Sequence, residues 1–193
     1  MQTMTRGGYG VARLQLTRRS NTRAWLAHGS LQLPCAIGRG GLQALKREGD
    51  GATPVGMFAL REVWYRPDRI CRPLTPHPTH AIGRRDGWCD ACGDRNYNRA
   101  VALPYRASTE SLWRQDRLYD VVGVLDYNLA PRSQGRGSCI FLHVARPGLG
   151  PTEGCIALAL DDLLRLIERP FPLLGIDTRA RPNDRPLRRA AFI

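Results

Sequence analysis

Two residues of the chain, His143 and Cys155, have the types and the spacing of a general base and a nucleophile. His143 stands near the end of an apolar run, and a loop rich in Gly and Pro leads to Gly154 and Cys155, which begin the next apolar run. A thiol attacks carbonyl carbons as its thiolate, so it needs a neighbouring base, and an imidazole across a loop supplies one. Gly154 permits a tight turn in which backbone N–H groups face a developing oxyanion. The pattern predicts nucleophilic catalysis by Cys155.

Each of these residues has a simpler interpretation when it is taken alone. An arbitrary cysteine is more often a small buried apolar residue, and an arbitrary histidine is more often a hydrogen-bonded core residue. The combination favours a catalytic site, because polar Thr152 and Glu153 directly precede Gly154 and Cys155 between two apolar runs. We therefore expect these residues to lie together.

The elements that must position this pair are mostly strands. Apolar alternation and enrichment in β-branched and aromatic residues predict early strands at residues 11–17, 23–28, 31–37 and 57–65. Near-continuous apolar runs predict buried central strands at residues 119–127 and 139–145. Because the second of these runs carries His143 and a short loop joins it to Cys155, the two elements are expected to be neighbours.

One helix is predicted after the nucleophile. Asp161 is a suitable N-cap, apolar residues follow on one face to about Glu168, and Pro170 ends the pattern. A last strand is expected around residues 176–181. The fold class predicted from these elements is mainly β with one helix.

Residues 66–110 hold five Pro and few periodic apolar positions, which predicts a long irregular insertion that covers the site as a lid. Asn96 and Tyr97, in a polar and aromatic segment, suit a substrate-facing loop, although a surface loop held by Asn and Asp turns fits as well. Cys89 and Cys92 form a single Cys-x-x-Cys pair, which is a weak zinc signal. No metal site and no cofactor are predicted.

Length and composition bound the remaining possibilities. The 193 residues predict one domain, residues 10–181, followed by a basic tail, residues 182–193. The longest apolar runs are of strand length, so no membrane span is expected. The formal net charge is +12, but residues 1–30 and 179–193 together hold ten Arg and one Asp. The charge is therefore concentrated at the ends, and nucleic-acid binding is not predicted. The six Cys show no paired spacing, which favours reduced thiols.

The chain resembles the YkuD-type L,D-transpeptidase catalytic domain over about residues 10–180. The residues that carry the resemblance are His143, Thr152, Gly154, Cys155 and Ile156. Upstream, Thr-Pro-Val-Gly-Met-Phe at residues 53–58 is similar to the family's Thr-Pro-x-Gly-x-Phe element. The chain departs from the family where Glu153 replaces the usual His and where Ala157 replaces the usual Arg or Asn. Its loop between His143 and Cys155 is also shorter than is common.

The resemblance implies a β-sandwich or barrel with the helix after the cysteine, and a two-step acyl transfer. Cys155 would attack the carbonyl of an L-centre in a peptidoglycan tetrapeptide stem and expel D-Ala, and an amine of a second stem would resolve the thioester. His143 would act as the base, oriented by the Val144 carbonyl, with N–H groups of Gly154 and Cys155 at the oxyanion. Contacts with the stem peptides are expected from Thr152, Glu153, Arg146, Asn96 and Tyr97.

Two alternative functions stay open at this point. Water in place of the amine would make the same site a hydrolytic peptidase or amidase. A basic polymer-binding module, stapled by zinc at Cys89 and Cys92, would use the Arg-rich ends instead. The resemblance implies the periplasm or the cell wall, whereas residues 1–10 show no secretory signal, so a cytoplasmic location also stays open. No oligomeric state is predicted.

Overall fold

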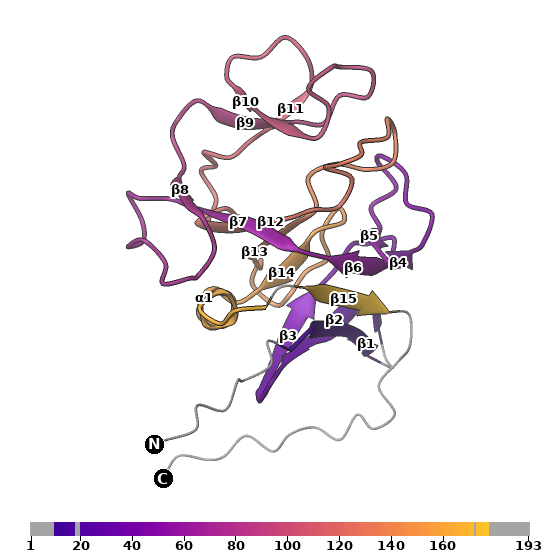
Figure 1. The fold of residues 1–193 in the computed structure, drawn as a ribbon, viewed down its shortest axis with the longest axis vertical. Helices are drawn as coiled ribbons and strands as arrows, with labels where there is room; N and C mark the ends of the chain where they lie inside the picture. The colour runs from indigo at the N-terminus through magenta and orange to yellow at the C-terminus, as the bar shows by residue number, and fades with distance from the viewer. Residues whose placement is uncertain (1–9, 18–19, 172, 178–193) are drawn as a thin grey trace, which may run out of the picture.

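The computed structural model describes residues 10–17, 20–171 and 173–177, and its main feature is a ten-stranded sheet (Figure 1). The order of the strands is β6-β15-β1-β2-β3-β14-β13-β12-β7-β8. Their bounds are β1 (Ala12–Thr17), β2 (Ser20–His28), β3 (Leu31–Ala36), β6 (Gly56–Phe58), β7 (Leu60–Tyr65), β8 (Thr79–Ala81), β12 (Val121–Leu125), β13 (Phe141–Val144), β14 (Ile156–Leu158) and β15 (Leu174–Asp177). The predicted mainly β class is confirmed.

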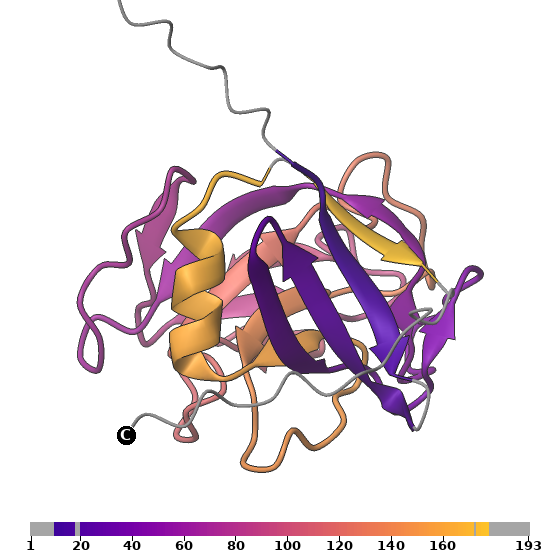
Figure 2. The same ribbon diagram turned by 90° about the horizontal axis from the view of Figure 1, so that it is seen from below.

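The sheet curls on itself, as the view from below shows (Figure 2). Strands β6 and β7 are separated only by Ala59, yet β6 pairs with β15 at one end of the strand order and β7 pairs with β12 near the other. A bend at Ala59, whose N–H donates to the Asp126 carboxylate at 2.8 Å, thus links the two ends. The expected single strand at residues 57–65 is therefore two strands.

The central strands β12 and β13 are buried on both faces, as their apolar runs predict. Side chains alternate between the two sides of a strand. Leu142 and Ile156 point into the main core inside the curl, whereas Phe141 points to the opposite face and belongs to a second apolar cluster. His143 is two residues from Phe141 and so lies on that second face.

The predicted helix is present as α1 (Leu160–Ile167), and it packs on the sheet through Leu163, Leu166 and Ile167. The predicted N-cap is wrong. Ala159 occupies the cap position without a side-chain hydrogen bond, and Asp161 lies two residues further on, in the first turn of the helix. There its carboxylate is near the positive end of the helix dipole, which stabilises the helix without a capping bond.

Two smaller sheets, of two and of three strands, complete the described fold. Strands β4 (Leu42–Gln43) and β5 (Thr53–Pro54) form a parallel pair.

The predicted last strand is present as β15, but residues 178–181 and the predicted tail at residues 182–193 lie outside the described residues. In the described part of the chain, no helix has the length and apolar character that a membrane crossing requires.

Residues 66–110 are loops and turns over most of their length, as predicted, but they are not irregular throughout. They contain β8 and a separate three-stranded sheet of β9 (Asp86–Cys89), β10 (Arg99–Ala102) and β11 (Thr109–Ser111). Trp88 of β9 packs edge-on against Phe141 of β13, with ring centroids 5.2 Å apart, and both belong to the second apolar cluster. Each strand of the insertion is short and buries few side chains, so the sequence shows no periodicity although the segment is ordered by packing.

Candidate active site

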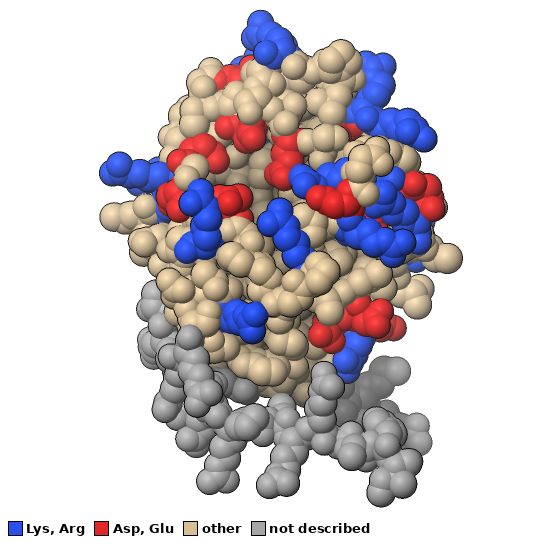
Figure 3. Space-filling view, turned by 180° about the vertical axis from the view of Figure 1, so that it is seen from behind, with Lys and Arg blue, Asp and Glu red and all other residues tan. Residues whose placement is uncertain are grey.

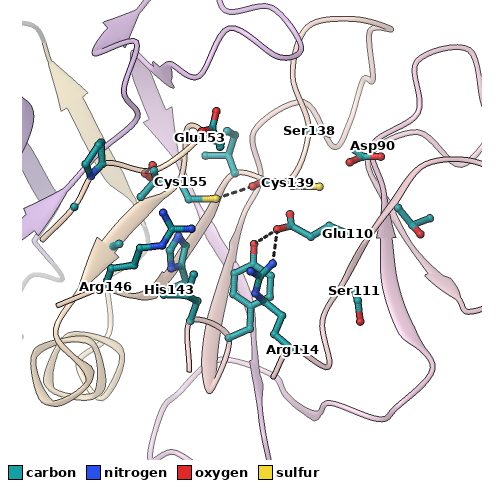
Figure 4. Close-up of a pocket in the computed structure, with 18 of the residues that line it drawn as sticks. Asp90, Glu110, Ser111, Arg114, Ser138, Cys139, His143, Arg146, Glu153 and Cys155 are labelled. Atoms are coloured by element: carbon teal, nitrogen blue, oxygen red, sulfur yellow. Dashed lines mark hydrogen bonds and ion pairs between the residues drawn. The ribbon is translucent and has the colours of Figure 1, made fainter. Parts of the chain in front are cut away.

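His143 and Cys155 face the same pocket from neighbouring parallel strands (Figure 4). The register of β13 and β14 pairs His143 with Ala157. Cys155 precedes Ala157 by two residues and therefore lies on the same side of the sheet as His143. The pocket has a volume of about 570 Å³, within the range of small-molecule sites. The prediction that the strand with His143 and the segment after Cys155 are neighbours is confirmed.

The imidazole of His143 is buried and held in one tautomer. Its Nδ1 lies 2.9 Å from the Val144 carbonyl oxygen. Since a carbonyl only accepts hydrogen bonds, Nδ1 carries the proton and the lone pair is on Nε2. Burial lowers the pKa of His143 to about 4, and the positive charges of Arg114 and Arg146 act in the same direction. At neutral pH the ring is an uncharged base.

The thiol of Cys155 is half-buried and protonated in this structure. Its Sγ donates to the Cys139 carbonyl oxygen at 2.9 Å and accepts the Phe141 N–H at 3.4 Å. Burial raises the pKa of Cys155 to about 12, and the negative charge of Glu110 adds to the rise. The resting pair is therefore a neutral thiol and a neutral imidazole, so attack on a carbonyl requires proton transfer to a base.

The turn before Cys155 explains why residue 154 is a glycine. Gly154 has a φ of +138°, and a Cβ there would lie 2.8 Å from the Ala52 carbonyl oxygen. Its N–H donates to the Thr152 hydroxyl at 3.1 Å, and that hydroxyl donates to the Cys155 carbonyl oxygen at 2.6 Å. The expectation that the Gly154 amide faces the oxyanion is thus wrong for this structure, because the Thr152 hydroxyl already accepts from it.

Thr53, in the upstream element of the sequence, anchors the turn that precedes Cys155. Its side chain is fully buried, and its hydroxyl accepts the Gly38 N–H at 2.9 Å and donates to the Gly154 carbonyl oxygen at 2.8 Å. The hydroxyl therefore joins two segments that are far apart in the sequence. The motif marks this position, but nothing in the sequence indicates its partner.

Replacing Thr53 with valine should lower the free energy of unfolding by about 1 to 3 kcal/mol, because the Gly38 N–H and the Gly154 carbonyl lose their buried partner. Thr53→Ser keeps the hydroxyl and is the matched control. Denaturant titration of both variants measures the effect. An unchanged unfolding midpoint for Thr53→Val would show that this anchor contributes nothing to stability.

The single lysine of the chain, Lys46, lies next to the turn that precedes Cys155. Its side chain is 3% exposed, and its ammonium donates to the Asp50 carboxylate at 2.6 Å. A Cβ built on Gly154 would lie 3.5 Å from the Lys46 Nζ. The positive charge lowers the pKa of the Cys155 thiol and so opposes the effect of burial. Sequence reasoning missed this residue, because a lone Lys in an Arg-rich chain carries no positional signal.

A second missed residue, Asn98, joins the insertion to the site. It is buried, and its side-chain oxygen accepts from the Trp88 indole at 3.0 Å and from the Cys139 N–H at 3.1 Å. The Cys139 carbonyl accepts the hydrogen bond of the Cys155 thiol. Cys139 has a φ of +54°, a conformation that costs free energy in a non-glycine residue. Asn98 thus helps to hold the backbone that positions the thiol.

The remaining predicted substrate contacts divide into two groups. Thr152, Glu153 and Arg146 all line the pocket with His143 and Cys155. Glu153, which stands where the family usually has His, points outward at 76% side-chain exposure and pairs with Arg39 at 2.7 Å. The exposed ion pair accommodates this replacement at the rim without a buried charge.

Asn96 and Tyr97 are not brought to the pocket. Tyr97 is 1% exposed, and its hydroxyl donates to the Glu48 carboxylate at 2.5 Å. Asn96 donates to the Tyr105 hydroxyl at 2.9 Å. The polar and aromatic composition of this segment indicated an exposed loop, but the loop turns inward and buries its aromatic ring. Tyr97 thus contacts the pocket-lining residue Glu48, whereas Asn96 is bonded within the insertion.

The Cys-x-x-Cys pair is divided between the interior and the surface. Cys89 is buried in β9, whereas Cys92 and Cys71 are exposed, and all three are free thiols. Within the described ranges, no three His, Cys, Asp or Glu side chains are grouped so that they would hold a metal ion.

Comparison with known proteins agrees with this geometry. The family model of the YkuD-type L,D-transpeptidase catalytic domain matches residues 15–172. No curated protein and no solved structure matches the chain. The matched segment includes the strands that carry His143 and Cys155, the helix that follows them and the whole insertion. The chain belongs to the L,D-transpeptidase catalytic domain family.

Proposed function

We propose that the protein transfers acyl groups between peptidoglycan stem peptides through a thioester on Cys155. The observation that carries the proposal is the tautomer of His143. Its Nδ1–H donates to the Val144 carbonyl, so the lone pair on Nε2 is free. His143 and Cys155 line the same pocket. A base fixed in this way needs no further residue to orient it.

In the first step, the thiol turns from the Cys139 carbonyl and gives its proton to Nε2 of His143, while Sγ attacks the carbonyl carbon of the donor stem. The Phe141 N–H and the positive charge of Lys46 favour the sulfur as it becomes negative. The C–N bond of the donor then breaks, and the imidazolium returns the proton to the leaving amine. The thioester and a neutral imidazole remain.

The basic side of the pocket supports an anionic donor. Arg114 and Arg146 both line it, and both act on His143 electrostatically. The guanidinium groups would donate charge-assisted hydrogen bonds to the free carboxylates of a peptide. In this proposal they supply the polar contacts that the Arg or Asn usual in the family would make at the position of Ala157.

Water as the second nucleophile would make the protein a hydrolase with the same acyl-enzyme, and only the product distinguishes the two reactions. Incubation with purified muropeptides, followed by mass spectrometry, should give D-Ala release together with cross-linked dimers. Release without dimers would favour the hydrolytic alternative. No change in any muropeptide would contradict acyl transfer on this polymer. The corresponding location, which we also propose, is the periplasm or the cell wall.

A polymer-binding module is less well supported by the surface. Acidic and basic side chains are interspersed over the face shown in Figure 3, which does not form a continuous basic field. Electrostatic binding of an anionic polymer requires such a field and weakens with salt.

The rate of acylation should stay constant through neutral pH and fall only as the pH drops through about 4, the lowered pKa of His143. The base form is present above this pKa and is lost below it, so the acidic limb lies below that of an ordinary imidazole. Intact-mass measurement of adduct formation across pH gives the profile, and tryptophan fluorescence at each pH separates acid unfolding. A midpoint near 6.5, the ordinary imidazole value, would contradict the lowering of the His143 pKa by burial.

A further inference from the structure

The insertion contributes an acidic side chain, Glu110, to the catalytic pocket. Glu110 lies in β11 and lines the pocket together with His143 and Cys155, and its side chain is 29% exposed. Figure 4 shows its carboxylate directed into the space beside Cys155, on the side opposite Arg146. The first reaction step described above does not use this carboxylate.

Glu110 is held in position by the residue that packs against the catalytic base. The Tyr119 hydroxyl donates to the Glu110 carboxylate at 2.6 Å. The Tyr119 ring packs edge-on against the His143 imidazole, with centroids 5.5 Å apart. The carboxylate and the base are therefore fixed relative to each other by one rigid aromatic side chain.

The surroundings of Glu110 compensate its negative charge only in part. Arg114, the nearest cation, binds Asp116 with two hydrogen bonds of 2.7 and 2.8 Å and reaches Glu110 only at 3.5 Å. On the same wall, the Oδ1 atom of Asp90 is buried and has no hydrogen-bond partner among the described residues. Burial and the charges of Asp90 and Asp116 raise the pKa of Glu110, against the opposite effects of Tyr119 and Arg114. This side of the pocket favours a cation that can give up a proton.

Resting on the proposed acyl transfer, we propose that Glu110 binds the acceptor amine as its ammonium ion and accepts its first proton. The neutral amine then attacks the thioester carbonyl, and its second proton passes to Nε2 of His143. The tetrahedral intermediate expels the Cys155 sulfur, which takes that proton from His143, and an amide bond is formed. Glu110 releases its proton to solvent. The Arg146 side of the pocket receives the donor, and the Glu110 side receives an amine that is cationic in solution.

Two small nucleophiles test this inference, because methylamine is an ammonium ion at pH 7 whereas hydroxylamine is neutral. With a tetrapeptide stem as donor, Glu110→Gln should slow transfer to methylamine about 100-fold at pH 7, the effect of losing a general base. Transfer to hydroxylamine should change less than about threefold, since it needs no first deprotonation. The methylamine defect should shrink as rising pH supplies the free amine. Product mass spectrometry measures all of these rates.

Three further measurements make the test decisive. Glu62→Gln removes a carboxylate outside the pocket and should leave both transfers unchanged. Glu110→Asp keeps the charge and should retain transfer to methylamine, which tests the inference also where the glutamine variant folds poorly. Adduct formation on wild-type Cys155 without any amine tests the acyl transfer itself. Equal losses with both nucleophiles, or no loss with either, would overturn the role of Glu110 alone, whereas absence of the adduct would overturn both proposals.

Discussion

Replacing Cys155 with alanine should abolish acyl transfer, lowering the rate about 10⁶-fold as is typical when a nucleophile is removed. Of the two cysteines that line the pocket, Cys155 is half-buried and lies beside the strand that carries His143, whereas Cys139 is buried. Without Sγ no thioester forms, and the remaining pocket only binds the donor. Intact-mass spectrometry after incubation with a tetrapeptide stem, or with a carbapenem of the kind accepted by the family, should detect no adduct on the variant.

Cys71→Ala is the matched control, because Cys71 is an exposed free thiol outside the pocket. It should react as fast as the wild-type protein. Thermal unfolding should show that Cys155→Ala stays folded, with a change of about 1 kcal/mol or less, since one sulfur atom is removed from a half-buried site. An adduct on the alanine variant would locate the nucleophile elsewhere and contradict the proposed function.

Replacing His143 with glutamine should lower the rate of acylation about 10³-fold, within the range for loss of a general base. Glutamine has a similar volume and keeps an N–H for the Val144 carbonyl, but it cannot accept the thiol proton. The wild-type rate should be constant through neutral pH. The residual rate of the variant should rise about tenfold per pH unit, because the thiolate then forms only by loss of the proton to solvent.

The shape of the pH profile separates catalysis from packing in this experiment. His80→Gln, at a half-exposed histidine paired with Glu62 outside the pocket, should preserve the wild-type rate and profile. A His143→Gln variant that is slow but still independent of pH would indicate a purely structural role for the imidazole, and would contradict its assignment as the base.

Much of the fold could be predicted because the strands carry their own local signals. The apolar runs around β12 and β13 indicated strands that are buried on both faces, and both are. The helix after Cys155 was predicted from the spacing of its leucines, although its cap was not. The bend at Ala59 could not be predicted, since it depends on the Asp126 side chain from a distant segment.

The insertion shows where local patterns fail. Its aromatic Trp88 meets Phe141, and its Asn98 meets the Cys139 backbone, across more than 40 residues of sequence. Short strands with few buried residues have no periodicity from which such contacts could be predicted. For the same reason Tyr97 was expected in the substrate groove, whereas it is buried and its hydroxyl binds Glu48.

The sequence by itself predicted the residues of the candidate site, because His143, Gly154 and Cys155 stand close together in the chain between two apolar runs. The tertiary structure alone decided the environment of that centre. Thr53, Lys46 and Glu110 reach it from other parts of the chain, and the contribution of each depends on the group that it contacts there. The physical reason is that a nucleophile and its base are defined by residue type and local geometry, whereas hydrogen-bond partners, desolvation and the field of distant charges exist only after the chain has packed.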